Sequence, residues 1–240
     1  MYNEQESNGG GRQQAPEALP EPEVSSATHF RFRLAGAMRL SDALVARAVG
    51  AYERVFTLDA GEQADIYVQL GSELGASGRG EEARAALRQA IALRPDDPQA
   101  WFQLGLVQLR QGASGAALDA FEKARALGMV SFDLHYRMAE ALADRDRHEA
   151  AAEEIRGAIR LDPDSAQAHC RLGVELDCLK RHEEAVGAFE RAIELAPREP
   201  SFYQSLGFTL DGMGRREQAI ACFKRAVELE RRASQGAVRP

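Results

Sequence analysis

Residues 98–131 read PQAWFQLGLVQLRQGASGAALDAFEKARALGMVS, and this stretch decides the fold because its pattern recurs along the chain. Within it, Gly105 follows a large apolar residue, and Ala117, Phe121 and Ala124 mark the second half. Glycine and alanine each recur along the chain, and most neighbours in each series lie 34 residues apart. The glycines are Gly71, Gly105, Gly173 and Gly207, and the alanines are Ala83, Ala117, Ala151, Ala185 and Ala219. Self-similarity at a fixed period of this length is the signature of a repeat protein.

The repeated unit resembles the tetratricopeptide repeat (TPR), a helix-turn-helix in which W-x2-L-G-x2-Y is followed by A-x3-F and then by P. Trp101, Leu104 and Gly105 match the first half of that pattern, and Ala117 and Phe121 match the second. The resemblance implies an all-α fold, a right-handed solenoid with a degenerate N-terminal helical repeat followed by five regular repeats. The regular repeats are expected at residues 64–97, 98–131, 132–165, 166–199 and 200–233.

Small residues at two positions of the unit predict a close crossing of its two helices. Gly or Ala at the eighth position is expected to face an Ala at the twentieth, so that the axes approach while large residues fill the gaps on either side. Replacing Gly173 with leucine is therefore expected to overpack one crossing.

Turn residues predict where the helices end. Glycine can take a positive φ without a Cβ penalty, and the turn position holds Gly78, Gly112 and Gly214. Asp146 and Lys180 stand at the same position, so those two turns are expected to be either strained or differently shaped. Proline cannot continue a helix and closes three of the units, as Pro95, Pro163 and Pro197, whereas Met129 replaces it after the second.

Composition narrows the classes of function. The net charge is −7, whereas a protein that binds duplex nucleic acid needs a clustered basic face. Nucleic acid is therefore not an expected partner. No apolar run approaches the length of a membrane span. Cys170, Cys178 and Cys222 form no C-x2-C pair and are expected to be small packing residues of a protein in a reducing compartment. Phosphate-binding loops, nucleophile elbows and metal-ligand spacings are missing from the sequence, so we expect neither an enzyme nor a cofactor.

Both ends of the chain differ from the repeats. Residues 1–28 are rich in Glu, Gln, Ser, Gly and Pro, which predicts a disordered acidic tail, and a second disordered tail is expected at 234–240. The N-terminal stretch lacks the basic and hydrophobic regions of a secretion signal, so a cytoplasmic location is expected.

Residues 29–63 match the repeat poorly but keep a helical spacing of apolar residues, which predicts a degenerate TPR-like helical segment. This segment has two possible roles. It can cap the first face of the solenoid, as atypical terminal repeats do. Alternatively, it can dock into the groove of a neighbouring molecule and build a homo-oligomer. The candidate self-association residues are Phe30, Phe32, Leu34, Met38, Tyr52 and Phe56.

The first helices of TPR proteins line a concave groove, commonly through the second, fifth, ninth and twelfth positions of each repeat. This register also includes Val68 and Ser72 in the first repeat. The predicted partner-binding residues, with three neighbouring arginines, are Phe102, Leu106, Leu109, Arg110, Asp133, Tyr136, Arg137, Glu140, Cys170, Arg171, Val174, Asp177, Gln204, Phe208 and Asp211. The expected partner is a protein segment with apolar anchors and some basic charge. Phe102, Leu106 and Phe208 have an alternative role, which is partial burial between neighbouring first helices.

Recurring histidines and carboxylates are interpreted as structural. His135 and His169 share the position of Trp101, about 10 Å apart at helix-packing distance, which favours packing over metal binding. His148 and His182 share a position near the turns and are expected to face solvent. Adjacent acids such as Glu153 and Glu154 point apart on a helix and are expected to be solvated.

The last two repeats are similar to a narrower group, the magnetosome-associated TPR proteins called MamA. The similarity rests on the string Arg171-Leu172-Gly173-Val174-Glu175-Leu176-Asp177, on Ala233-Ser234 before a short Arg/Pro ending, and on a degenerate segment ahead of five good repeats. It implies a scaffold without catalysis that coats the vesicle around a magnetic crystal from the cytoplasmic side. In that group, the irregular N-terminal repeat docks into the groove of the next molecule, and membrane contact is indirect, through partner proteins. The alternative is a monomeric cytoplasmic adaptor that binds one client peptide.

Overall fold

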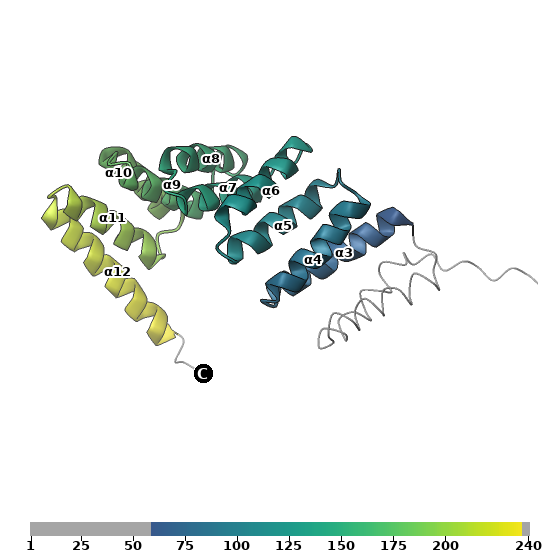
Figure 1. The fold of residues 1–240 in the computed structure, drawn as a ribbon. Coiled ribbons are helices and arrows are strands. Elements are labelled where there is room, and N and C mark those ends of the chain that lie inside the picture. The colour runs from purple at the N-terminus through teal and green to yellow at the C-terminus, as the bar shows by residue number, and fades with distance from the viewer. Residues whose placement is uncertain (1–58, 237–240) are drawn as a thin grey trace, which may run out of the picture. The chain divides into compact units, whose positions relative to one another are not determined.

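The computed structural model describes residues 59–236, which form an all-α array (Figure 1). A boundary between Phe56 and Thr57 divides the chain into two units, and the array belongs to the second. Its helices are α3 (Ala60–Ala76), α4 (Gly80–Leu93), α5 (Pro98–Arg110), α6 (Ser114–Ala126), α7 (Phe132–Ala143), α8 (His148–Leu161), α9 (Ala166–Cys178), α10 (His182–Leu195), α11 (Pro200–Gly212) and α12 (Arg216–Gly236). The predicted all-α repeat fold is confirmed. The predicted acidic tail and the self-association residues of the N-terminal segment lie outside the described residues.

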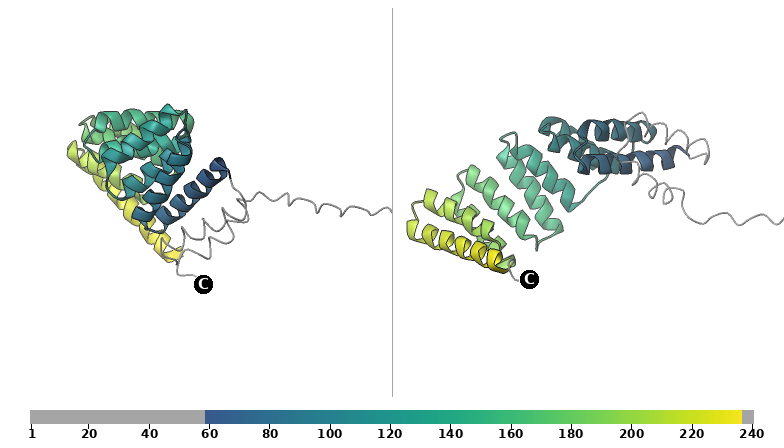
Figure 2. Two further views of the ribbon diagram at one scale, coloured as in Figure 1. Left: turned by 45° about the vertical axis from the view of Figure 1, so that its right-hand side comes forward. Right: turned by 90° about the horizontal axis from the view of Figure 1, so that it is seen from below.

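The helices pair as five consecutive hairpins, α3 with α4 through α11 with α12, and each second helix packs on the first helix of the next hairpin (Figure 2). First helices also touch one another, α3 with α5, α5 with α7, and α9 with α11. The first helices therefore form the inner layer of the array, where the sequence placed the groove.

Large side chains of the second helix pack directly on the glycines of the first helix in four of the five hairpins. A Cβ added to Gly173 would lie 2.7 Å from the ring of Phe189, and one added to Gly105 would lie 2.4 Å from Phe121. Leu87 and Phe223 cover Gly71 and Gly207 in the same way. The eighth position thus lies nearest to the large residue at the twenty-fourth position. A flat ring seated on bare backbone fills the space, which a smaller residue would leave empty.

The turn between the two helices is the same in all five repeats. Lys180 (φ 62°) and Asp146 (φ 57°) adopt the left-handed conformation that Gly78, Gly112 and Gly214 adopt elsewhere. Each turn closes with a pair of backbone hydrogen bonds, such as Lys180 N–H to Asp177 C=O at 2.9 Å and Arg181 N–H to Leu176 C=O at 2.9 Å. This is the Schellman arrangement. The sequence left open whether the turns at Asp146 and Lys180 would be strained or differently shaped. They have the same shape as the others, and the backbone of one residue in each is strained.

Proline has a second role at the junctions between repeats, which the sequence did not reveal. The Trp101 indole N–H donates to the Pro95 carbonyl at 2.9 Å, and the Tyr203 hydroxyl donates to the Pro197 carbonyl at 3.1 Å. His169 Nε2 lies 3.0 Å from the Pro163 carbonyl. A fourth-position side chain therefore ties its helix to the preceding junction wherever a proline stands there.

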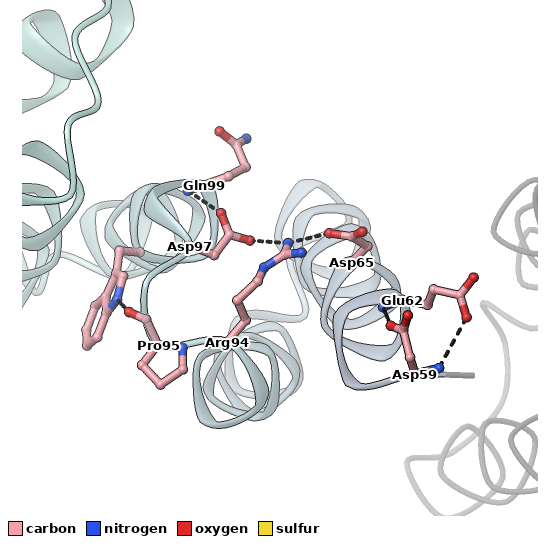
Figure 3. Close-up of polar contacts among 8 residues, drawn as sticks. Asp59, Glu62, Asp65, Arg94, Pro95, Asp97 and Gln99 are labelled. Carbon is pink, nitrogen blue, oxygen red and sulfur yellow. Dashed lines mark hydrogen bonds and ion pairs between the residues drawn. The ribbon is translucent and has the colours of Figure 1, made fainter. Parts of the chain in front are cut away.

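Arg94 joins the first two repeats, as Figure 3 shows. It lies at the end of α4 and pairs with Asp65 of α3 and with Asp97, at 2.7 Å from the latter. Asp97 is also the N-cap of α5, accepting from the Gln99 N–H at 2.9 Å. Hydrogen bonding to Asp97 and to Asp65 raises the pKa of Arg94, so this bridge stays charged.

Two boundaries differ from the prediction. Asp59 and Glu62 form a capping box, so α3 begins at Ala60, ahead of the expected repeat start at 64. At the other end, α12 continues to Gly236, which places residues 234–236 in a helix and not in the predicted tail. No proline follows α12 at the position where Pro95, Pro163 and Pro197 follow other second helices.

Candidate protein-binding surfaces

The apolar residues predicted for the groove divide into three classes of exposure. Phe102 is buried, with 8% of its surface exposed, because its ring packs against Phe121 with 5.7 Å between centroids. Phe102 is therefore a core residue, and its prediction as a binding residue is wrong. Leu106, Leu109, Tyr136, Cys170 and Val174 are half-buried. Phe208 is 69% exposed, and its ring meets Phe223 edge-on at 5.2 Å.

Tyr136 is the most polar of the half-buried set. Its ring stacks on Phe132 at 5.6 Å, and the Arg137 guanidinium carbon lies 5.7 Å from the ring centroid. Burial raises the pKa of the Tyr136 hydroxyl, which therefore stays protonated and able to donate a hydrogen bond. An aromatic ring with an adjacent cation and a polar tip is a common anchor at protein interfaces.

The three predicted arginines have different surroundings. Arg110 is exposed at the end of α5, where a guanidinium nitrogen would lie 3.4 Å from a Cβ at Gly75 of α3. Arg137 pairs with Glu140 at 2.9 Å on the surface of α7. Arg171 lies 2.8 Å from Glu175, whose side chain is 1% exposed. Of these three arginines, Arg110 makes no ion pair within the described residues, whereas Arg137 and Arg171 each pair with a carboxylate of their own helix.

Two of the predicted groove acids remain open to a partner. Asp133 and Asp211 are exposed, and neither forms an ion pair among residues 59–236. Asp177, in contrast, lies 2.8 Å from His182 Nδ1, and Glu140 pairs with Arg137. Gln204 donates to Glu230 of α12 at 2.7 Å. The inner layer therefore presents uncompensated negative charge near α7 and α11.

Glu175 is the residue that the sequence analysis missed. Its two carboxylate oxygens face Arg171, at 2.8 Å, and His148 Nδ1 of the preceding repeat, also at 2.8 Å. The corresponding position holds buried Val107, Ala141 and Thr209 in three other repeats and half-buried Glu73 in the first. A carboxylate at a position that is buried in the neighbouring repeats was the available signal, because burial of a charge requires partners.

The histidines make polar contacts that correct part of the prediction. His148 and His182 were expected to face solvent, yet both are partly buried because each holds a carboxylate, on Glu175 and Asp177 respectively. His135 packs over Gly157, and its Nδ1 lies 2.7 Å from Glu154. With no proline carbonyl available at the Met129 junction, His135 bonds within its own repeat.

The cysteines are not equivalent. Burial raises the pKa of the Cys170 thiol to about 11, so it is a protonated packing group at neutral pH. Cys222 is half-buried against the core of the last repeats, as expected. Cys178 is exposed, so its prediction as a packing residue is wrong.

Membrane-spanning helices and metal-binding clusters are both absent from the described residues. None of the helices α3 to α12 is long and apolar enough to cross a membrane. Likewise, residues 59–236 contain no group of three or more His, Cys, Asp or Glu side chains placed to hold a metal ion.

Solved structures similar to this chain include MamA and the TPR protein YrrB. The crystal structure of MamA protein shares 27% identity, covering 75% of this chain and 98% of that one, with a TM-score of 0.68. MamA 41-end from Desulfovibrio magneticus RS-1 shares 26% identity over 71% of this chain and 97% of its own, also at 0.68. YrrB, described as a TPR protein with an unusual peptide-binding site, shares 23% identity over 76% and 92%, at 0.65, and supports the fold alone.

Among curated proteins, human protein O-mannosyl-transferase TMTC3 is 32% identical over 101 residues, 41% of this chain. The chain spans only about a tenth of that relative's length, since the match covers 11% of it.

Models of the tetratricopeptide repeat match residues 68–131, 136–200 and 200–232, which is more than half of the sequence. These ranges coincide with the hairpins from α3 to α12. The chain therefore belongs to the tetratricopeptide repeat family and resembles MamA.

Proposed function

We propose that this protein is a non-catalytic scaffold whose copies assemble with one another on the cytoplasmic side of a magnetosome membrane and recruit other proteins there. Support comes from the likeness to MamA, which extends over 98% of the solved MamA chain at 27% identity. A TPR array suits this role because it offers a long interaction surface without a large core.

The observation that carries self-assembly is a complementarity between two parts of the chain. Residues 29–58 combine helically spaced apolar residues with five arginines and only two acids, a surplus of three positive charges. The inner layer of the array combines half-buried apolar residues with the unpaired carboxylates of Asp133 and Asp211. The N-terminal segment of one molecule therefore has the character expected of a ligand for the groove of another.

The test is the solution mass of the full-length protein, measured by light scattering over a concentration series. A double variant, Phe30→Glu with Phe56→Glu, removes two apolar anchors and should convert a large assembly into small species. Arg47→Gln removes one of the five arginines of the same segment and should weaken the assembly less than the double variant does, since four arginines and all the apolar anchors remain. Assembly should also weaken as salt rises, since exposed charges are screened over about 8 Å at physiological ionic strength.

The acceptor side is tested separately. Tyr136→Ser should weaken assembly without unfolding the helices, as judged by circular dichroism, because the ring is only half-buried. If neither the Phe30/Phe56 double variant nor Tyr136→Ser changed the assembly, the proposal that the groove accepts the N-terminal segment would be contradicted. Retention on isolated magnetosome vesicles, reversed by a salt wash, would support the proposed location.

The second candidate is a monomeric adaptor that binds a client peptide in the same groove. Exposed Asp133 and Asp211 beside the Tyr136 ring favour a basic peptide with an aromatic or aliphatic anchor. A full-length protein that stays monomeric at high concentration would favour this adaptor over the scaffold.

A further inference from the structure

The last repeat leaves uncovered a surface that every earlier repeat covers. Ile220 of α12 is 52% exposed, whereas its counterparts in earlier repeats, Leu118 and Val186, are 6% and 7% exposed. Val227 is 62% exposed, whereas its counterparts Ile159 and Ile193 are half-buried against the core. The helix that would cover these positions is the first helix of a following repeat, and α12 is the last described helix.

The uncovered apolar residues form one strip. Phe208 of α11 is 69% exposed and rests on half-buried Phe223, which stands one helical turn from Ile220 and from Val227 on α12. We name Phe208, Ile220, Phe223 and Val227 the end face. Neighbouring apolar side chains with this exposure mark an interaction site more often than single exposed ones do.

Charges along the end face are arranged symmetrically. Glu217, Lys224 and Arg231 lie on the same side of α12 as Ile220 and Val227, with Glu217 and Arg231 at equal distances along the helix from Lys224. All three are exposed, and neither Glu217 nor Arg231 forms an ion pair or hydrogen bond within the described part of the chain. Glu183, the counterpart of Glu217, pairs with Arg215 of the next repeat at 3.4 Å. The acid therefore lacks the basic partner that the array supplies elsewhere.

We infer that the end face binds the end face of a second copy of this chain, through antiparallel packing of the two α12 helices about a two-fold axis near Lys224. In that arrangement Glu217 of each copy meets Arg231 of the other, and Ile220 meets Val227. The contact is isologous, so one patch supplies both sides. Lys224 meets its own copy, a like-charge contact that keeps the dimer weak.

This contact deepens the self-assembly part of the proposed function and shares one residue, Phe208, with the predicted groove; none of the variants below changes Phe208. Groove docking links molecules head to tail, and end-face pairing joins two such chains of molecules. The test is therefore made on full-length protein carrying Phe30→Glu and Phe56→Glu, in which groove docking is disabled. If the groove proposal is wrong, those two changes alter nothing, and the end-face comparison remains readable against that same parent.

Sedimentation of this parent should show a monomer–dimer equilibrium. Adding Ile220→Glu with Val227→Glu should abolish the dimer while the helical content stays unchanged. Glu217→Arg alone should weaken dimerisation about tenfold, because the symmetric contact loses two pairs at once. Combining Glu217→Arg with Arg231→Glu should restore the dimer, since the charges are reversed and not lost. A charge-reversed double variant that stays as weak as Glu217→Arg would overturn the antiparallel register.

Crosslinking locates the axis. In a Cys178→Ser background, Lys224→Cys should form a disulfide-linked dimer under mild oxidation, because position 224 faces itself across the axis. Glu190→Cys is the matched control, since Glu190 is exposed at the same repeat position of α10 and should not crosslink. Equal crosslinking at both positions, or dimers that persist in the Ile220/Val227 variant, would overturn the inference.

Discussion

Lys180 shows how one backbone angle overrides a residue's own preference. With φ at 62°, it adopts the conformation that glycine adopts in three sister turns, and the turn retains both of its closing hydrogen bonds. The cost is local, because a Cβ in the left-handed region crowds the neighbouring carbonyl by roughly 1–2 kcal/mol. Repetition of the hairpin geometry imposes this strain, since every turn must deliver the second helix at the same angle.

Lys180→Gly is accordingly expected to raise the free energy of unfolding by about 1 kcal/mol, measured from the shift of the urea midpoint. Lys180→Ala keeps the Cβ and is the control, with little change expected. A gain in the alanine variant equal to that in the glycine variant would attribute the effect to the lysine side chain and not to φ.

The two helices of each hairpin pack together through a small residue on the first helix and a large residue on the second. Three repeats pair Gly with Phe, as Gly105 with Phe121, whereas the third repeat has Ala139 together with Ile155, both buried. The third repeat thus shows that a methyl group is tolerated at the crossing when the opposing side chain is not a ring. Shape complementarity, and not helix propensity, sets the residue at this position.

Gly173→Ala is expected to destabilise the protein by about 1–3 kcal/mol, because the new Cβ would lie 2.7 Å from the Phe189 ring. Gly187→Ala is the control on the adjacent helix, where a Cβ meets nothing within 4 Å. It should stabilise by up to about 1 kcal/mol through helix propensity. Adding Phe189→Ile to Gly173→Ala should recover part of the loss, and thermal melts of the four proteins decide the question.

Across the whole molecule, stability depends on links between neighbouring repeats. His148 reaches from the third repeat to the buried carboxylate of Glu175 in the fourth, whereas His182 contacts Asp177 within the fourth at the same 2.8 Å. The first contact couples two repeats and satisfies a buried charge. The second does neither, since Asp177 is partly exposed.

His148→Ala should therefore cost about 1–3 kcal/mol, because Glu175 loses one of its two partners. Hydrogen exchange should rise around the junction of α8 and α9 and leave α3 to α5 unchanged. His182→Ala is the matched control and should cost less than about 1 kcal/mol. If both variants lost the same free energy of unfolding, the burial of Glu175 would add nothing to the stability that its contact with His148 provides.

The sequence by itself determined the repeat length, the all-α fold and most helix boundaries, because glycine, alanine and proline act through local sterics that need no knowledge of neighbours. It also placed the groove positions by register. Only the tertiary structure decided which of them are accessible: Phe102 is buried against Phe121 and Phe208 is exposed, although both stand on groove positions. It likewise decided that Glu175 is buried between Arg171 and His148 and that Ile220 and Val227 lack the cover their counterparts have. Burial depends on which helix lies opposite, and a periodic sequence does not specify that at the end of its array.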